Sequence, residues 1–198
     1  RRDIKVIEKS LTGVDWYRKP EKSARFDSGS LVRVTPGKDT LFQGIKKAGI
    51  GGIVELAPGD YEVGKTIALE HAVTVRSQGL ATITFERSAL FEIKDGGSLK
   101  LSGVTISGAS APDYAGNSVI RTSRNSMLDN YEVVIENSHF SDLDVNRGFD
   151  VLTGFKGTMA DRITITGSTF SGVSGSVLKL DAETDDLGIY NADHVVIS

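Results

Sequence analysis

The sequence predicts an all-β protein, a right-handed parallel β-helix with a short capping helix near its N-terminal end. Three observations predict this fold. A pattern of alternating apolar residues returns at spacings of 34, 30 and 32 residues. The segments between its copies hold short strands and leave no room for crossover helices. Glycine is frequent, with 22 in 198 residues. Parallel strands without helices between them close into a coil, and successive coils stack as a solenoid.

The N-terminal part of the chain is predicted to lead into this solenoid. Residues 1–26 carry a net charge of +4, whereas the whole chain carries −3. We therefore expect a basic linker and leading segment over residues 1–36 and the β-helix domain over residues 37–198. The last strand, 195–198, ends without a turn or a cap, and exposed strand edges are normally protected. This predicts a domain that is truncated at its C-terminal end.

A short helix is predicted at the start of the solenoid. Asp39 or Thr40 can cap its N-terminus, and Gly49 ends it. Its apolar residues fall on one side, which would cover the open end of the first coil: Leu41, Phe42, Ile45 and Ala48.

The repeat itself predicts the strands of the solenoid. Its two leading apolar positions alternate with polar ones, as in half-buried strands. They are held by Leu99 and Leu101, Val133 and Ile135, Ile163 and Ile165, and Val195 and Ile197. Further strands are expected over 81–85, 90–93, 118–122, 149–153 and 176–180. A β-sandwich would also explain short strands, but it would not explain a pattern that returns at these spacings.

Turn chemistry agrees with this repeat. Asn137 falls at a turn position that Gly103 and Gly167 hold in the sister coils. Asparagine tolerates left-handed backbone better than most residues, so we expect a backbone role for Asn137.

Composition excludes several classes of function. A net charge of −3 gives no reason to expect nucleic-acid binding, and no apolar run is long enough for a membrane helix. The absence of cysteine excludes disulfides, zinc–thiolate sites and a cysteine nucleophile. The three histidines lie in different coils without metal-ligand spacing.

Two resemblances follow from particular motifs. The short helix followed by residues 53–61 (IVELAPGDY) resembles the start of pectate-lyase-like β-helices. The stretch from Lys38 to Ser198 resembles polysaccharide lyase family 6, the alginate lyases and chondroitinase B, and it is most similar to the C-terminal β-helix domain of its two-domain members. The matching segments are 116–124 (GNSVIRTSR), 134–140 (VIENSHF) and 185–192 (DDLGIYNA), and 14–20 (VDWYRKP) resembles the linker before that domain.

The resemblance implies a specific chemistry for the parent enzyme. Family members cleave uronate polysaccharides by β-elimination, with a Lys as base, an assisting Arg, and Ca²⁺ held by Asn and Glu. In this chain Phe149 stands where a metal carboxylate is expected, and only Asp150 is acidic there. Lys156 is displaced by one residue, and Asp181 stands in the Arg position. We therefore expect no catalytic residues, metal ligands or cofactor in this segment, and Ca²⁺ in the catalytic domain of the parent.

Three basic residues are candidates for contact with an acidic sugar: Arg121, Arg124 and Lys156. Arg121 alternates with apolar residues on its strand, so it can equally be an ordinary outward side chain. Lys156 follows a turn, where a solvated lysine is the default. The acidic run at 181–186 lacks the loop order of an EF-hand and can equally contact a neighbouring domain.

The leading hypothesis is a non-catalytic domain that supports the catalytic domain or the substrate groove of an alginate-lyase-like enzyme. The alternatives are a lyase with rearranged catalytic residues, and a carbohydrate-binding or structural solenoid. The expected partners are the catalytic β-helix domain of the same parent chain, an acidic polysaccharide such as alginate, and a second copy in a homodimer. The resemblance also implies a secreted or periplasmic location.

Overall fold

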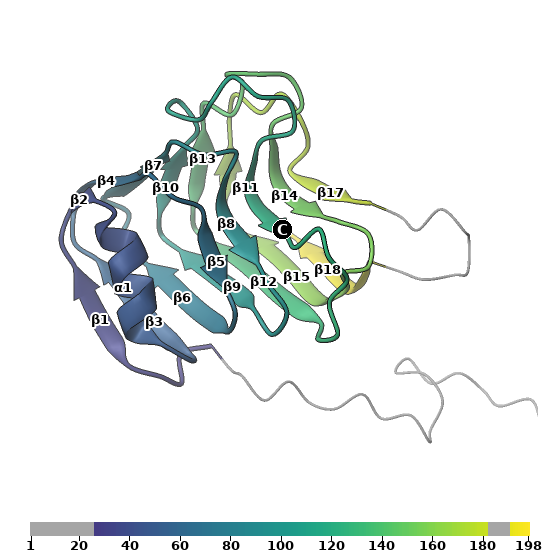
Figure 1. The fold of residues 1–198 in the computed structure, drawn as a ribbon. Coiled ribbons are helices and arrows are strands. Elements are labelled where there is room, and N and C mark those ends of the chain that lie inside the picture. Colours follow the sequence, from purple (N-terminus) through teal and green to yellow (C-terminus); the bar gives the residue numbers. More distant parts are fainter. Residues whose placement is uncertain (1–25, 182–190) are drawn as a thin grey trace, which may run out of the picture.

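The described residues of the computed structural model, 26–181 and 191–198, form a right-handed parallel β-helix (Figure 1). The strands form three sheets of seven, six and five strands, each complete coil adds one strand to each sheet, and every pairing between the described strands is parallel. This confirms the predicted all-β solenoid and its single short helix. No helix within the described residues is both long and apolar enough to cross a bilayer.

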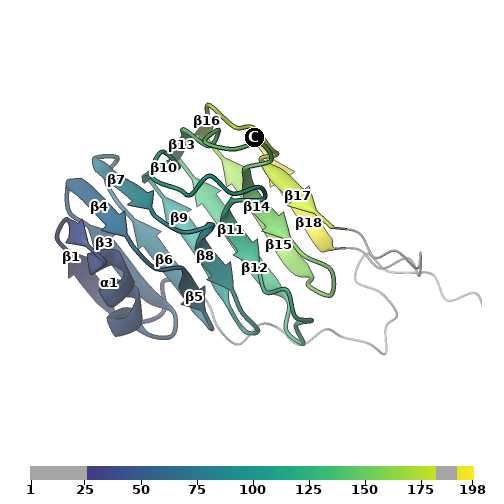
Figure 2. The same cartoon turned by 45° about the horizontal axis from the view of Figure 1, so that its top comes forward.

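Within each sheet, the strands of successive coils are stacked one after another along the solenoid axis (Figure 2). Sheet 1 contains β1 (Leu31–Val34), β3 (Gly52–Leu56), β6 (Ala72–Arg76), β9 (Ser98–Ser102), β12 (Tyr131–Glu136), β15 (Ala160–Thr166) and β18 (Ala192–Ile197). Sheet 2 contains β2 (Gly37–Lys38), β4 (Gly59–Val63), β7 (Ala81–Phe85), β10 (Thr105–Ser107), β13 (His139–Ser141) and β16 (Thr169–Phe170). Sheet 3 contains β5 (Ile67–Leu69), β8 (Ala89–Ile93), β11 (Ser118–Thr122), β14 (Asp150–Gly154) and β17 (Leu178–Leu180).

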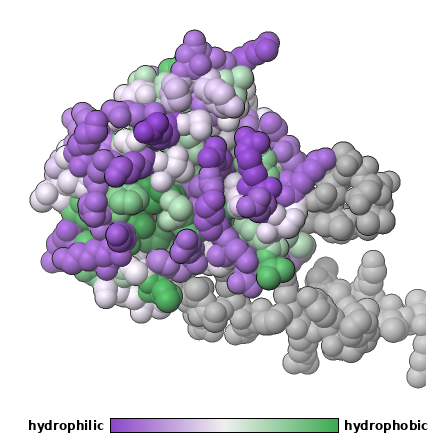
Figure 3. Space-filling model, viewed as in Figure 1, coloured by the Kyte–Doolittle hydropathy of each residue, from purple (hydrophilic) through white to green (hydrophobic). Residues whose placement is uncertain are grey.

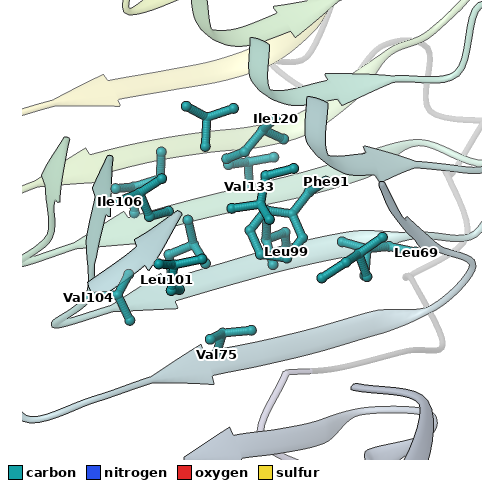
Figure 4. Packing of buried hydrophobic residues seen from close by; sticks show 14 of the residues in the cluster. Leu69, Val75, Phe91, Leu99, Leu101, Val104, Ile106, Ile120 and Val133 are labelled. Carbon is teal, nitrogen blue, oxygen red and sulfur yellow. The ribbon is translucent and has the colours of Figure 1, made fainter. Parts of the chain in front are cut away.

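The core is a column of apolar side chains stacked from coil to coil. Leu99 pairs with Val133, which pairs with Ile163, and all three are fully buried. Sheets 2 and 3 supply the facing side chains, such as Ile106 and Ile120 (Figure 4). The register therefore buries the repeat positions of β9, β12 and β15 as expected, whereas Val195 and Ile197 on β18 are 45% and 63% exposed.

The helix α1 (Thr40–Ala48) lies at the N-terminal end of the stack and buries Leu41, Ile45 and Ala48 against the core. It ends before Gly49, as predicted. Asp39 does precede the helix, but its side chain makes no cap hydrogen bond. Its Oδ1 accepts instead from the backbone N–H of Gly64, at 2.8 Å. Asp39 thus ties the helix start to the strand end of the next coil.

Several element boundaries differ from the predicted ones. The strand expected over 149–153 is β14, Asp150–Gly154, because Phe149 belongs to the turn and points into the core. The strand expected over 176–180 is shortened to β17, Leu178–Leu180. Sheet 1 begins with β1, inside the segment predicted to lead into the solenoid. The basic linker predicted at 14–20 lies outside the described residues.

Asn137 adopts the left-handed conformation that its position predicts. Its φ is 49°, and the corresponding Gly103 and Gly167 have φ of 66° and 55°. The side chain of Asn137 is exposed, so the backbone angle is its main constraint.

We expect Asn137→Gly to keep or slightly raise stability, whereas Asn137→Val lowers it by about 1–2 kcal/mol because a β-branched residue resists positive φ. Urea unfolding of the two variants and the parent measures this difference. Equal midpoints for the Val and Gly variants contradict the assigned backbone role.

Candidate functional site

The three predicted basic residues lie on one side of the solenoid, on sheet 3 and the turns that follow it. Arg121 is on β11 and pairs in register with Thr153 on β14. Arg124 and Lys156 each follow these positions by three residues, so they occupy the same place in successive coils. Figure 3 shows this side as largely hydrophilic, with a hydrophobic area next to α1.

Arg121 is held in an ion pair within the sheet. Its Nε and Nη2 donate to Glu92 Oε2 on β8 at 2.8 and 2.5 Å, and Nη1 donates to Ser88 Oγ at 3.4 Å. Only 20% of the Arg121 side chain and 15% of the Glu92 side chain are exposed. The guanidinium therefore neutralises Glu92, and it does not reach out as a free cation.

Glu92 has a second cationic partner, because Lys94 Nζ also donates to its carboxylate. Burial acts to raise the pKa of Glu92, but the hydrogen bonds from Lys94 and Arg121 together outweigh it and lower that pKa. Glu92 thus stays ionised, and its carboxylate pairs with Arg121 on β11 and with Lys94, which directly follows β8.

Arg124 and Lys156 differ from Arg121, since both are exposed. The Arg124 guanidinium lies over the ring of Phe155, 4.6 Å from its centroid. Lys156 follows Phe155 directly and forms no ion pair with any described residue. These two side chains are the part of the predicted set that can meet a ligand from solvent.

Acidic groups border the same turns. Asp95 Oδ1 accepts from the backbone N–H groups of Leu128 and Asp129, at 2.9 and 2.8 Å. A shallow hollow lies beside it, lined by Glu70, Lys94, Asp95, Ser123, Asn125, Ser126 and Met127. The surroundings of Arg124 therefore carry both signs of charge, which limits how strongly this surface attracts a polyanion.

The residues at the expected catalytic positions serve the fold. Phe149 is fully buried and packs edge-on against Phe85, with ring centroids 6.1 Å apart. The Asp150 side chain is buried and accepts from Thr153 Oγ1 at 3.0 Å and from the backbone N–H of Ser176 at 2.8 Å. Asp181 lies after β17, where its N–H donates to the Gly154 carbonyl oxygen.

These residues do not fit the Ca²⁺ that the resemblance assigns to the catalytic domain. Ca²⁺ prefers six to eight oxygen ligands, but the single carboxylate here already orients a turn and lies 3.8 Å from Lys179 Nζ. Within residues 26–181 and 191–198, no three acidic or histidine side chains gather as a metal site. Residues 183–186 of the acidic run lie outside the described residues.

One polar cluster escaped the sequence reasoning. On sheet 2, Ser107 and Ser141 both donate to Asp142 Oδ2, at 2.7 and 2.8 Å. His139 Nδ1 lies 2.6 Å from Thr169 Oγ1 beside them. The hydrogen bonds from the two serines, with the neighbouring His139, lower the pKa of Asp142. The sequence signal for this cluster is a polar–apolar–polar tripeptide that recurs from coil to coil. It indicates strands but not that their polar side chains meet. The tripeptides are TIT, TIS, HFS and TFS at 82–84, 105–107, 139–141 and 169–171.

Comparison with known proteins identifies relatives among solved structures. The structure of the PL6 family alginate lyase AlyGC matches with a TM-score of 0.87 and 41% sequence identity, over 93% of this chain. A mutant of AlyGC matches equally. The chain spans about a quarter of the AlyGC length, 26%. No protein-family model and no curated protein matches. The chain is therefore related to polysaccharide lyase family 6, which confirms the resemblance seen in its sequence.

We expect Arg121→Met to lower the free energy of unfolding by about 1–3 kcal/mol, because it leaves the half-buried Glu92 with Lys94 alone. Denaturant unfolding measures this loss. The matched control is Arg124→Met, which removes an exposed cation and should cost less than about 1 kcal/mol. If the double variant Arg121→Met, Glu92→Met is no more stable than Arg121→Met, the loss of stability does not come from the Glu92 carboxylate that has lost its Arg121 partner.

The lowered pKa of Glu92 also predicts how stability depends on pH. Its contribution is fully present above the ordinary value of 4.5 and is lost as the pH falls through the lower folded value. We therefore expect Glu92→Gln to reduce stability at neutral pH and to flatten the decline below pH 4.5. Unfolding free energies of parent and variant, measured at a series of acidic pH values, test this. Parallel curves contradict the assignment.

Proposed function

We propose that this chain is a non-catalytic β-helix domain of a polysaccharide lyase, and that it supports the catalytic β-helix domain or the substrate groove of its parent enzyme. The relation to AlyGC, an alginate lyase, supports the choice of parent activity. In the parent, a uronate polysaccharide is cleaved by β-elimination, and Ca²⁺ acts in the catalytic domain. A polymeric substrate of this kind favours a secreted or periplasmic location.

The state of the expected catalytic positions carries this proposal. β-Elimination needs a base at the C5 proton and positive charge at the neighbouring carboxylate, both converging on one sugar. Here Phe149 fills the core and Asp150 holds a turn. The cation best placed on β11, Arg121, is neutralised by Glu92. These placements support a scaffold role for the described residues.

A weak contact to the same polysaccharide is compatible with this role. Arg124 and Lys156 are exposed in successive coils. Phe155 directly precedes Lys156, and the Arg124 guanidinium lies over its ring. We assign them to the edge of a substrate path that the catalytic domain completes. Homodimer formation belongs to the same proposal, since a second copy can complete such a path as well.

The rival function is a lyase with rearranged residues, and the exposure of Lys156 is the observation in its favour. In that reading Lys156 removes the proton and Arg124 steadies the carboxylate. The supporting domain and the rival lyase are both expected to bind alginate, but only the rival lyase is expected to turn it over.

We expect no unsaturated uronate product when the purified chain is incubated with alginate or chondroitin sulfate, with and without Ca²⁺. Ultraviolet absorbance of the new double bond is the measurement, and AlyGC is the positive control on alginate. Turnover that is abolished in Lys156→Ala and retained in Lys179→Ala would establish the rival function. Turnover unaffected by Lys156→Ala would place the chemistry elsewhere in the chain and would also overturn the proposal.

A further inference from the structure

The outward face of sheet 1 carries an apolar row that runs from β1 to β18 (Figure 2). Its members alternate along their strands with inward residues such as Val54, Leu101 and Ile165, which belong to the core. The register pairs each member with the next, coil by coil. Four of the seven are aliphatic, and contiguous apolar side chains on a surface generally mark a contact. The members are Leu31, Ile53, Thr74, Lys100, Val134, Thr164 and Val196.

The middle of this row is shielded from solvent. Thr74 and Val134 are 1% and 9% exposed although both point outward, whereas Leu31 and Val196 at the two ends are exposed. The Thr74 hydroxyl has no hydrogen-bond partner among the described residues, and a buried hydroxyl normally has one. The middle of the apolar row therefore has the exposure of a contact surface and not of a face open to water.

The described part of the chain begins on this same face. The backbone N–H of Gly29 donates to the Gly51 carbonyl oxygen, just before β3, at 2.8 Å. Two residues earlier, Asp27 Oδ2 lies 3.3 Å from Lys100 Nζ on β9. The same ammonium is 3.8 Å from Glu136 Oε2 on β12, so Asp27 meets it on the side of the later coils. Followed toward its N-terminus, the chain thus leaves the turn before β3 and crosses the outward face of sheet 1 toward β12.

Charge favours the segment before residue 26 as the occupant of this face. The three strands that lie ahead of it, β12, β15 and β18, hold four acidic residues and one arginine, a net charge of −3 with histidine neutral. Residues 1–25 carry +4. Opposite charges on two surfaces favour their contact. The charged residues of the three strands are Glu132, Glu136, Asp161, Arg162 and Asp193.

Length and composition agree with this occupant. The distance from β9 to β18 is three strand spacings, about 14 Å, which a few extended residues can cross. Residues 14–25 are long enough, and they combine apolar Val14, Trp16 and Tyr17 with four basic residues. We infer that residues 14–25 lie across the outward face of sheet 1 from β9 to β18, with Trp16 packed on the apolar row beyond Lys100. This contact fixes the path by which the chain enters the solenoid, and it does not depend on whether the chain is catalytic.

Fluorescence of the full chain tests the inference, because Trp16 is its only tryptophan and it has no cysteine. A nitroxide on Thr166→Cys stands beside the apolar row on β15, and the same label on Thr105→Cys stands outward on sheet 2 as the matched control. A nitroxide quenches tryptophan only at short range. We therefore expect the label at 166 to lower Trp16 emission at least twofold and the label at 105 to leave it nearly unchanged. Equal quenching by the two labels, or none by either, overturns the inference.

Two further variants identify the occupant and its contact. A labelled Thr166→Cys chain that also carries Trp16→Phe is mixed with unlabelled parent, and we expect no quenching, because each segment lies on its own solenoid. Quenching between molecules makes a second copy the occupant and overturns the inference. Val134→Lys places a charge in the apolar row, and we expect it to reduce the quenching within the chain labelled at 166 to the level of the label at 105. Circular dichroism checks that this variant keeps its fold, and unchanged quenching in the folded variant contradicts the assigned contact.

Discussion

The whole molecule depends on the register between successive coils. Backbone hydrogen bonds run from one coil to the next, so a slip of one residue would turn every inward side chain of a strand outward. Val133 meets Leu99 on one side and Ile163 on the other, and all three must be apolar at the same height. A repeat in sequence is therefore a requirement of this fold, because each coil is the template for the next.

Turns preserve the register, and the space around each turn limits which residues it can contain. Gly103, Asn137 and Gly167 share one left-handed position, but they are not equally replaceable. A Cβ on Gly103 would lie 2.3 Å from the Ser77 carbonyl oxygen, which excludes a side chain there. Asn137 already carries one and faces solvent. The same turn thus admits variation only in coils where the neighbouring chain leaves room.

The fold was predictable from the sequence because the apolar repeat and the turn residues are local signals of a periodic structure. The pairing of Arg121 with Glu92 was not, since the two lie 29 residues apart and meet only when the register of β8 and β11 is fixed. Asp39 was expected at a helix cap, but the N–H of Gly64 in the next coil competes for its carboxylate. Phe149 was assigned to a strand because a buried aromatic in a turn has no periodic signal. The cluster at Asp142 was missed because its partners come from two coils, and Ser107 lies 35 residues away in the sequence.

A solenoid separates what keeps it folded from what its surface does. The core needs apolar side chains at inward positions, and it accepts Phe149, which adds an aromatic contact to Phe85. An aromatic side chain at such a place is therefore compatible with the fold. Outward positions are under no such demand, so each face can acquire its own character. On sheet 3 the charges of Arg121, Glu92 and Lys94 pair with one another, whereas Arg124 and Lys156 in the turns that follow are exposed. Polar groups that are already paired within a sheet offer a ligand little, so contact from solvent on this side is left to the exposed side chains of the turns.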